Sequence, residues 1–287
     1  MNSSFYEDLK FKAFRSGNPV FLYIGINTVV FIVVSLLGVG LFLSGNGFDF
    51  ATAFSREYFG VPASLAKLPY RFYTIISYQF FHEGFFHFFF NMIWLYWMGN
   101  IFNDFTKSRQ FHFVFLGSGL LGAVFFIAAY HTFPVFAPAI ETANVIGSSA
   151  SVMGVVVATA TLVPDFSIRM MFLGEVKLKY LAAAYILLSV IGIASMNAGG
   201  NIAHLGGALF GFIYIKTLKN GADWSDMFKK KTKLKVVKNE TFKRTAPKAP
   251  SIINQQEIDA ILDKISKSGY DKLSREEKET LFKASNH

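Results

Sequence analysis

Charged side chains are scarce in the first 215 residues of this chain. Of its 28 Lys and Arg residues, 17 lie at Lys216 or beyond, together with 10 of its 19 Asp and Glu residues. The first 215 residues therefore hold 11 basic and 9 acidic side chains. A water-facing surface needs about 25–35% charged residues, so this part of the chain is not an ordinary soluble enzyme. Hydrophobic residues make up 52% of the chain, which also excludes an intrinsically disordered protein.

Uncharged runs divide the same region into candidate membrane spans. A helix needs about 20 mostly apolar residues to cross a bilayer core of about 30 Å. Five runs contain no Asp, Glu, Lys or Arg: 20–43, 84–102, 110–140, 142–164 and 180–215. The last run is long enough for two short spans, divided near Asn197 to Asn201. We therefore predict an all-α polytopic membrane protein with six transmembrane helices.

The basic residues predict the orientation of these spans. Cytoplasmic loops of membrane proteins carry an excess of Lys and Arg. If the N-terminus lies inside, 25 Lys and Arg fall on the inner side, and only Arg56, Lys67 and Arg71 fall on the outer side. We therefore predict that both termini are cytoplasmic.

The tail differs in composition from the spans. Residues 229–250 are basic and contain two prolines, and Gly269 lies between two segments with helical spacing of apolar residues. Asn254 with Glu257 predicts a helix start, and Ser274 with Glu277 has the spacing of a second capping box. A solubilising tail and a surface that docks to a partner or to the membrane part both fit this pattern. The predicted divisions are a cytoplasmic segment 1–18, a membrane domain 19–218, a basic linker 219–250 and a helical hairpin 251–287.

Cysteine content and charge limit the cofactors and partners. The chain has no Cys, which excludes disulfides, a thiol nucleophile, an iron–sulfur cluster and Cys-bound zinc. The net charge of +9 comes mostly from the tail, where it favours contact with anionic lipid. We expect a lipid bilayer as the environment, lipid or protein contact through the basic tail, no nucleic-acid partner, and neither a metal nor a cofactor.

Polar side chains inside spans are costly and therefore mark candidate functional sites. His87 and Asn91 are four residues apart, which places them on one face of the second span. His204 belongs to the sixth span. The fourth span begins after Gly147 with three serines: Ser148, Ser149 and Ser151. The predicted orientation puts all three groups in the outer half of the bilayer.

Small residues recur every four positions on the fourth and sixth spans. Such stripes let helix backbones approach closely in a membrane. The stripes are Ala150, Gly154 and Ala158 on one span and Ala203, Gly207 and Gly211 on the other. Contact between them would bring a serine beside His204, although plain helix packing explains the stripes equally well.

The combination of these groups suits nucleophilic acyl transfer. A serine hydroxyl becomes a good nucleophile when a neutral imidazole takes its proton, and Asn91 and His87 are suitable donors to an oxyanion. Asp104 and Asp165 belong to the inner side, so a Ser/His dyad is expected. The residues alone also permit serines that act as helix caps, Asn91 as a contact between helices, and a transport pathway.

The motifs resemble those of the rhomboid family of intramembrane serine proteases. The matching segments are His87-Phe-Phe-Phe-Asn91, Gly147-Ser148-Ser149-Ala150 and the run from Ala203-His204 through Gly207 to Gly211, with Tyr70-Arg71 in the first outer loop. The resemblance implies an enzyme of the bacterial inner membrane that cleaves a transmembrane protein in or near its membrane segment.

The resemblance also implies a role for each matching residue. Ser149 would be the nucleophile, His204 the base, and His87 and Asn91 the oxyanion donors. Structural positions would be Gly147, Arg71, His82, Gly207 and Gly211. Ala150 stands where the commonest family pattern has Gly, which leaves every catalytic group in place, so we expect an active endopeptidase. The alternatives are a catalytically silent rhomboid-like binder of membrane segments and a small-solute transporter.

Overall fold

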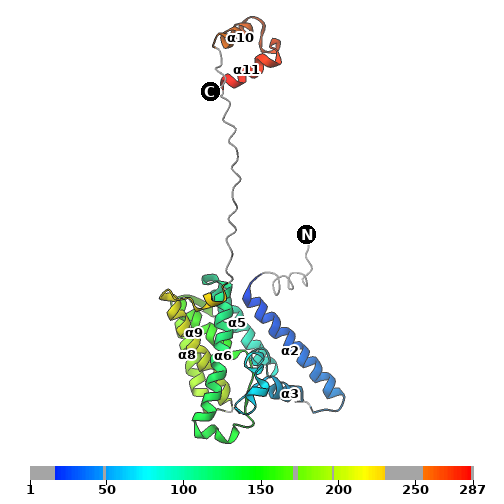
Figure 1. Ribbon diagram of the computed structural model, residues 1–287, viewed down its shortest axis with the longest axis vertical. Helices are drawn as coiled ribbons and strands as arrows, with labels where there is room; N and C mark the ends of the chain where they lie inside the picture. Colours follow the sequence, from blue (N-terminus) through cyan, green and yellow to red (C-terminus); the bar gives the residue numbers. More distant parts are fainter. Residues whose placement is uncertain (1–16, 48–49, 171–173, 196, 230–254, 286–287) are drawn as a thin grey trace. The chain divides into compact units, whose positions relative to one another are not determined.

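The computed structural model describes residues 17–47, 50–170, 174–195, 197–229 and 255–285 (Figure 1). The chain divides into two compact units, Met1–Lys230 and Lys231–His287. Most of the described residues are helical, as the sequence predicts.

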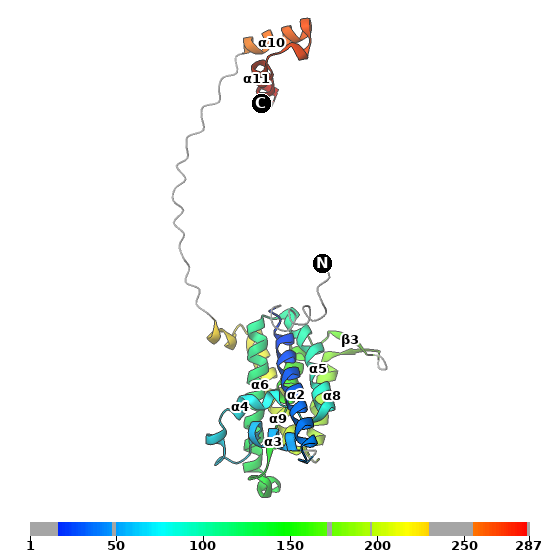
Figure 2. The same cartoon turned by 90° about the vertical axis from the view of Figure 1, so that its right-hand side faces the viewer.

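The described residues of the first unit form six long helices that carry the apolar runs of the sequence. These are α2 (Pro19–Leu43), α5 (Gly84–Phe105), α6 (Ser108–Thr132), α7 (Ser149–Leu162), α8 (Leu178–Gly192) and α9 (Ala198–Lys219). Short helices occupy the connections: α3 (Phe50–Phe59), η1 (Leu68–Arg71), α4 (Thr74–Ser77), η2 (Tyr78–Phe80), η3 (Pro134–Ala139) and η4 (Trp224–Phe228). Figures 1 and 2 show α5, α6, α8 and α9 running in roughly the same direction, and Figure 1 shows α2 inclined to them.

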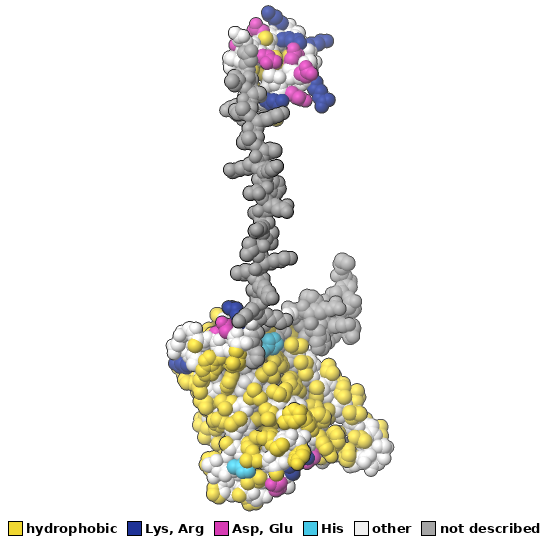
Figure 3. Space-filling view, in the orientation of Figure 1, with side chains coloured by type: hydrophobic (Ala, Val, Ile, Leu, Met, Phe, Trp, Pro, Cys, Tyr) yellow, Lys and Arg dark blue, Asp and Glu magenta, His cyan; other side chains and the backbone are white. Residues whose placement is uncertain are grey.

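The composition of these helices suits a membrane. Three of them are long and apolar enough to cross one, α2, α6 and α9, and α7 and α8 are shorter apolar helices. Hydrophobic side chains cover the face of the first unit that Figure 3 presents, and charged groups gather near its ends. Soluble monomeric proteins rarely expose so much continuous apolar surface. The chain is therefore an integral membrane protein.

α7 forms the centre of the bundle. Eleven of its fourteen residues, all those from Ala150 to Ala160, are buried. It packs against α5, α6, α8 and α9. A helix that is apolar on every side must be surrounded by others, and this position explains why α7 has no polar face.

Glycines bring α6, α7 and α9 into backbone contact. There is no room for a side chain at Gly207 or Gly211, because a Cβ would overlap the backbone of Ala150 or Gly154 on α7. At Gly122 of α6, a Cβ would lie 2.7 Å from Ala150 Cβ and 2.8 Å from Ala203 O. The close packing predicted for the fourth and sixth spans is confirmed, and α6 joins it through Gly122.

Two helices fill only part of the uncharged runs that contain them. The third run extends to residue 140, and α6 ends within it at Thr132, followed by η3, since Pro134 and Pro138 interrupt the helix. The fourth run starts at residue 142, and α7 starts within it at Ser149, after Gly147 as predicted. The residues before it form a strand and a turn.

The all-helical prediction missed two small antiparallel sheets. Strand β1 (Val61–Pro62) pairs with β2 (Asn144–Val145), with Val61 opposite Val145. Strand β3 (Ser167–Met170) pairs with β4 (Gly174–Lys177). The first sheet ties the long loop before α5 to the segment that leads into α7.

α2 is anchored mainly through its start. Asn18 caps it by accepting a hydrogen bond from Val20 N at 2.9 Å, and Pro19 suits the first turn. Its four buried residues, Pro19, Val20, Tyr23 and Asn27, all lie in the first nine positions. Beyond Asn27, α2 faces α3 across a cavity of about 510 Å³.

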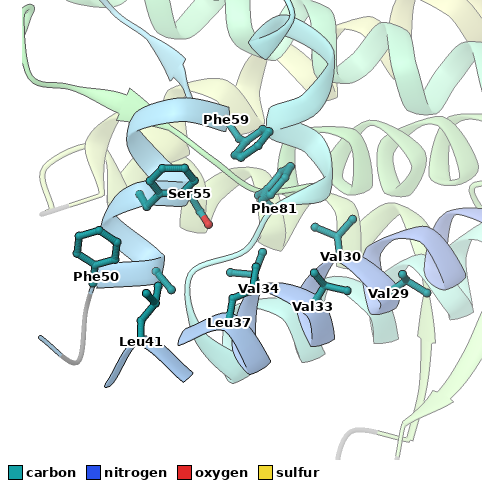
Figure 4. Close-up of a pocket in the computed structure, with 12 residues that line it drawn as sticks. Val29, Val30, Val33, Val34, Leu37, Leu41, Phe50, Ser55, Phe59 and Phe81 are labelled. Atoms are coloured by element: carbon teal, nitrogen blue, oxygen red, sulfur yellow. The ribbon is translucent and has the colours of Figure 1, made fainter. Parts of the chain in front are cut away.

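That cavity has almost entirely apolar walls (Figure 4). Its lining comes from α2, α3 and the loop residue Phe81, and the one hydroxyl among the side chains drawn belongs to Ser55. Val34 and Leu37 face Phe50 and Phe59 across it.

A polar cluster holds the end of the bundle where α6 begins and α9 ends. Asp223 accepts hydrogen bonds from Tyr214 OH at 2.9 Å, Gln110 Nε2 at 2.9 Å and Arg109 at 3.0 Å. Ser225 donates to the same carboxylate through its N–H and its hydroxyl. Burial would raise the pKa of Asp223, but hydrogen bonds from Ser225, Tyr214, Arg109 and Gln110 outweigh it and hold that pKa well below its usual range.

The second unit is a helical hairpin of α10 (Gln255–Ser268), η5 (Tyr270–Lys272) and α11 (Arg275–Ser285). Helix α10 stops at Gly269, whose φ is +82°. The capping box is present: Glu277 N donates to Ser274 Oγ at 3.2 Å, and Ser274 N donates to Glu277 Oε2 at 2.7 Å. The predicted helix start at Asn254 lies outside the described residues.

Candidate active site

The polar groups predicted from the sequence lie at one end of the bundle. His87 is in the first turn of α5, Ser149 is the first residue of α7, and His204 is in the second turn of α9. The close packing of α7 on α9, through Ala150 and Gly207, places the start of α7 beside the third turn of α9, one turn from His204.

Gly147 shapes the approach to Ser149. Its φ is +129°, a conformation that side chains rarely adopt. Its N–H donates to Tyr78 O at 2.9 Å. A Cβ at this position would lie 2.9 Å from His87 Nε2 and 3.6 Å from Ser149 Oγ. Only glycine therefore fits between the imidazole and the serine.

The serines around Ser149 have separate partners. Ser148 Oγ lies 2.9 Å from Nε2 of the buried His82, and the Ser148 side chain makes no cap hydrogen bond to α7. Ser151 Oγ donates to Gln79 Oε1 at 2.8 Å. Ser148 and Ser151 therefore join α7 to the loop before α5, while Ser149 lies at the half-buried edge of the site.

α8 contacts the His204 ring on one side. Ser189 Oγ lies 3.2 Å from His204 Nδ1, and the Tyr185 ring meets the imidazole edge to face at 6.0 Å. His87 is close enough to His204 for the two imidazoles to interact electrostatically. The sequence reasoning missed Ser189, although a single serine in an apolar span is a signal of the kind that marked His204.

Ser149 and His204 belong to two helices that pack on each other, and no hydrogen bond joins them in the described parts of the chain. Among the described residues, no hydrogen bond reaches Ser149 Oγ or Nε2 of His204. Catalytic hydrogen bonds are often long in an unliganded enzyme and shorten when substrate binds. The nitrogen of His204 that faces away from Ser189 is thus available to a nucleophile.

His87 and Asn91 lie on the same face of α5. Asn91 is buried, and its Nδ2 donates one hydrogen bond to His87 O at 2.8 Å. An amide nitrogen carries two hydrogens, so the second remains for another acceptor. The first N–H groups of α7 also have no partner within their own helix.

Arg71 connects the long loop to α3. Its guanidinium donates to both Glu57 O and Glu57 Oε1 at 2.5 Å. Glu57 Oε2 in turn accepts from Asn144 Nδ2 at 3.2 Å. The hydrogen bond from Arg71 lowers the pKa of Glu57 against the effect of partial burial. Arg71 therefore holds η1 against α3, and Glu57 links α3 to Asn144 of β2. Asn144 lies three residues before Gly147.

Comparison with known families identifies the fold. The model of the Rhomboid domain matches residues 69–220, more than half of the chain. The chain belongs to the rhomboid family. The resemblance expected from its motifs is thereby confirmed, and the matched rhomboid domain contains every candidate residue from Arg71 to Gly211.

The C-terminal hairpin of this rhomboid matches a second model, a family of unknown function (DUF6576), over residues 251–287. No curated protein matches the chain. In the parts of the rhomboid that the structure describes, no three His, Asp or Glu side chains come together as a metal site.

Proposed function

We propose that this rhomboid is an intramembrane serine endopeptidase in which Ser149 is the nucleophile and His204 the general base. The observation that supports it best is the position of Gly147 between the His87 ring and Ser149 Oγ, at the start of a helix that packs against the helix carrying His204, in a bundle with an apolar exterior. A serine at the start of a helix beside an imidazole is the arrangement that acyl transfer requires.

The reaction would proceed in two stages. Ser149 Oγ attacks the carbonyl carbon of the scissile peptide bond, and His204 Nε2 takes the hydroxyl proton. The C–N bond then breaks, and the proton on His204 passes to the leaving amine. Water attacks the resulting ester, gives one proton to His204 and releases Ser149 Oγ, which regains that proton.

The negative oxygen of each tetrahedral intermediate needs donors. The second amide hydrogen of Asn91, the His87 ring and the Ser149 N–H would be these donors. The His87 ring and Ser149 lie on either side of Gly147, and Asn91 lies one turn from His87 on the same face of α5. The positive end of the α7 dipole also favours negative charge there.

The membrane arrangement belongs to the same proposal. The six long helices would each span the bilayer, with both termini in the cytoplasm of a bacterial cell and the site toward the outer face. The excess of Lys and Arg on the inner segments supports this orientation. The substrate would be a membrane protein that is cut in or near its own transmembrane segment, without a metal or cofactor.

One observation favours the alternative, a catalytically silent rhomboid-like binder of membrane segments. Within the described residues, Ser149 Oγ makes no hydrogen bond to His204. A silent binder would keep this arrangement permanently, whereas a protease would form the bond during turnover.

A covalent probe separates the two functions. Purified protein in detergent is treated with a fluorophosphonate, and the labelled peptide is identified by mass spectrometry. The protease predicts a label on Ser149 that is lost in Ser149→Ala and in His204→Ala. Ser151→Ala is the matched control, because it removes a buried hydroxyl from the same helix and should still be labelled. A folded wild-type protein without label would refute the proposal.

A further inference from the structure

The neutral His204 ring can adopt either of two tautomers, which differ in the ring nitrogen that carries the hydrogen. A neutral imidazole carries a hydrogen on one nitrogen and a lone pair on the other. Only the form with hydrogen on Nδ1 leaves a lone pair on Nε2 for the serine proton. A group that binds Nδ1 therefore decides whether the ring can act as a base.

Ser189 is that group. Its Oγ lies 3.2 Å from His204 Nδ1, and its side chain is buried in α8 at 2% exposure. We propose that Ser189 is a positioning residue: its hydroxyl oxygen accepts the Nδ1–H of His204 and keeps Nε2 free to serve Ser149. This inference rests on the proposed function and adds a third member to the expected dyad.

The surroundings of Ser189 support a fixed geometry. Tyr185 precedes it by one helical turn and packs edge to face on the same imidazole. Tyr185 also stacks on Trp94 of α5 at 5.7 Å. The ring of His204 is thus held by a hydrogen bond and an aromatic contact from one face of α8.

A second hydrogen bond sets the register of α8 on α9. Asn201 Nδ2 donates to Gly192 O at 2.9 Å, one turn from the Ser189–His204 contact on both helices. A side chain at Gly192 would overlap Asn201. Sliding α8 along α9 would break both bonds together, so the hydroxyl of Ser189 cannot easily drift away from Nδ1.

The chemistry of the base explains why an acceptor is useful here. When His204 takes the proton from Ser149, the ring becomes positive and both nitrogens carry hydrogen. Ser189 Oγ then accepts from a charged donor, and such hydrogen bonds are stronger than neutral ones. The contact thus stabilises the protonated ring more than the resting one, which favours the transition state.

Fluorophosphonate labelling at varied probe concentration tests the proposal, since it separates the maximal labelling rate from probe binding. Ser189→Ala should lower the maximal rate about tenfold, the value of one ordinary hydrogen bond, and leave probe binding unchanged. The thiol of Ser189→Cys fills the place of the hydroxyl but is a weak acceptor, so this variant should also be labelled slowly.

Two results would overturn the inference. If Ser189→Cys labels at the wild-type rate while Ser189→Ala is slow, the residue only fills space. If Asn201→Ala, which loosens the same helix pair without touching the imidazole, slows labelling as much, the effect comes from helix register. Wild-type labelling that His204→Ala abolishes and Ser189→Ala leaves unchanged would refute the role of Ser189 while the protease assignment stands.

Discussion

Gly122 lies where three helices meet, and replacing it by Ala should disturb both halves of the proposed dyad. The added Cβ would be 2.7 Å from Ala150 Cβ and 2.8 Å from Ala203 O. Ala150 follows Ser149, and Ala203 precedes His204. Carbon atoms in contact lie about 3.5–4.0 Å apart, so α6 must move away from α7 and α9 by about 1 Å.

The loss of stability in Gly122→Ala depends on how little Ala150 and Ala203 can move. Overpacking a core costs about 1–3 kcal/mol, and both obstacles here are fixed to helix backbones, which places Gly122→Ala near 3 kcal/mol. Ala gains about 1 kcal/mol over Gly in helix propensity. The net loss is about 2 kcal/mol, or about 4–8 °C in melting temperature for a domain of this size.

The assay is thermal unfolding in detergent, followed by tryptophan fluorescence, beside the rate of fluorophosphonate labelling. A displacement of about 1 Å in a catalytic group costs about 10²-fold in rate, so labelling should fall by that order. Gly40→Ala is the matched control, because a Cβ at this exposed position of α2 meets nothing within 4 Å. If Gly122→Ala melts and labels as Gly40→Ala does, the packing argument is wrong.

Three further variants examine other contacts. Asn91→Ala should slow labelling by about 10²-fold or more if the amide stabilises the oxyanion; an unchanged rate would leave Asn91 as a contact within α5. Arg71→Ala releases Glu57 and should speed tryptic cleavage after Lys67, whereas equal cleavage in both proteins would contradict the anchoring role. The pKa of Asp223 is lower in the folded protein than the value of about 3.9 in an unfolded chain. Its contribution to stability is therefore complete at neutral pH and is lost as the pH falls below about 4. Asp223→Asn should be less stable than the wild type at pH 7 and should lose less stability on acidification. A difference in stability between the two proteins that stays the same at every pH would refute this.

The long helices were predictable because their cause is local. A run without charge favours a helix in a membrane wherever it occurs, and the predicted run 20–43 differs from α2 by one residue. The uncharged run 142–164 does not by itself mark the start of α7, whereas the serines that follow Gly147 do. Apolar residues before Ser149 look like helix, but the pairing of Val145 with Val61 and the positive φ of Gly147 keep them extended.

The candidate site was partly predictable for the same reason. His87, Asn91, Ser149 and His204 stand out as polar residues in apolar runs, and the structure brings them to one end of the bundle. Ser189 satisfies the same criterion, but its importance depends on the rotation of α8 relative to α9. Helix rotation is set by packing between distant segments, such as Gly192 against Asn201.

The shortness of α7 would place the proposed chemistry below the surface of the membrane. Fourteen residues extend about 21 Å at 1.5 Å per residue, about 9 Å less than the hydrocarbon thickness of a bilayer. His204 lies six residues into α9, which is again about 9 Å from the start of that helix. In the proposed reaction, a peptide bond that reaches Ser149 would therefore lie below the bilayer surface, and the water that hydrolyses the ester would have to descend about the same distance between the helices.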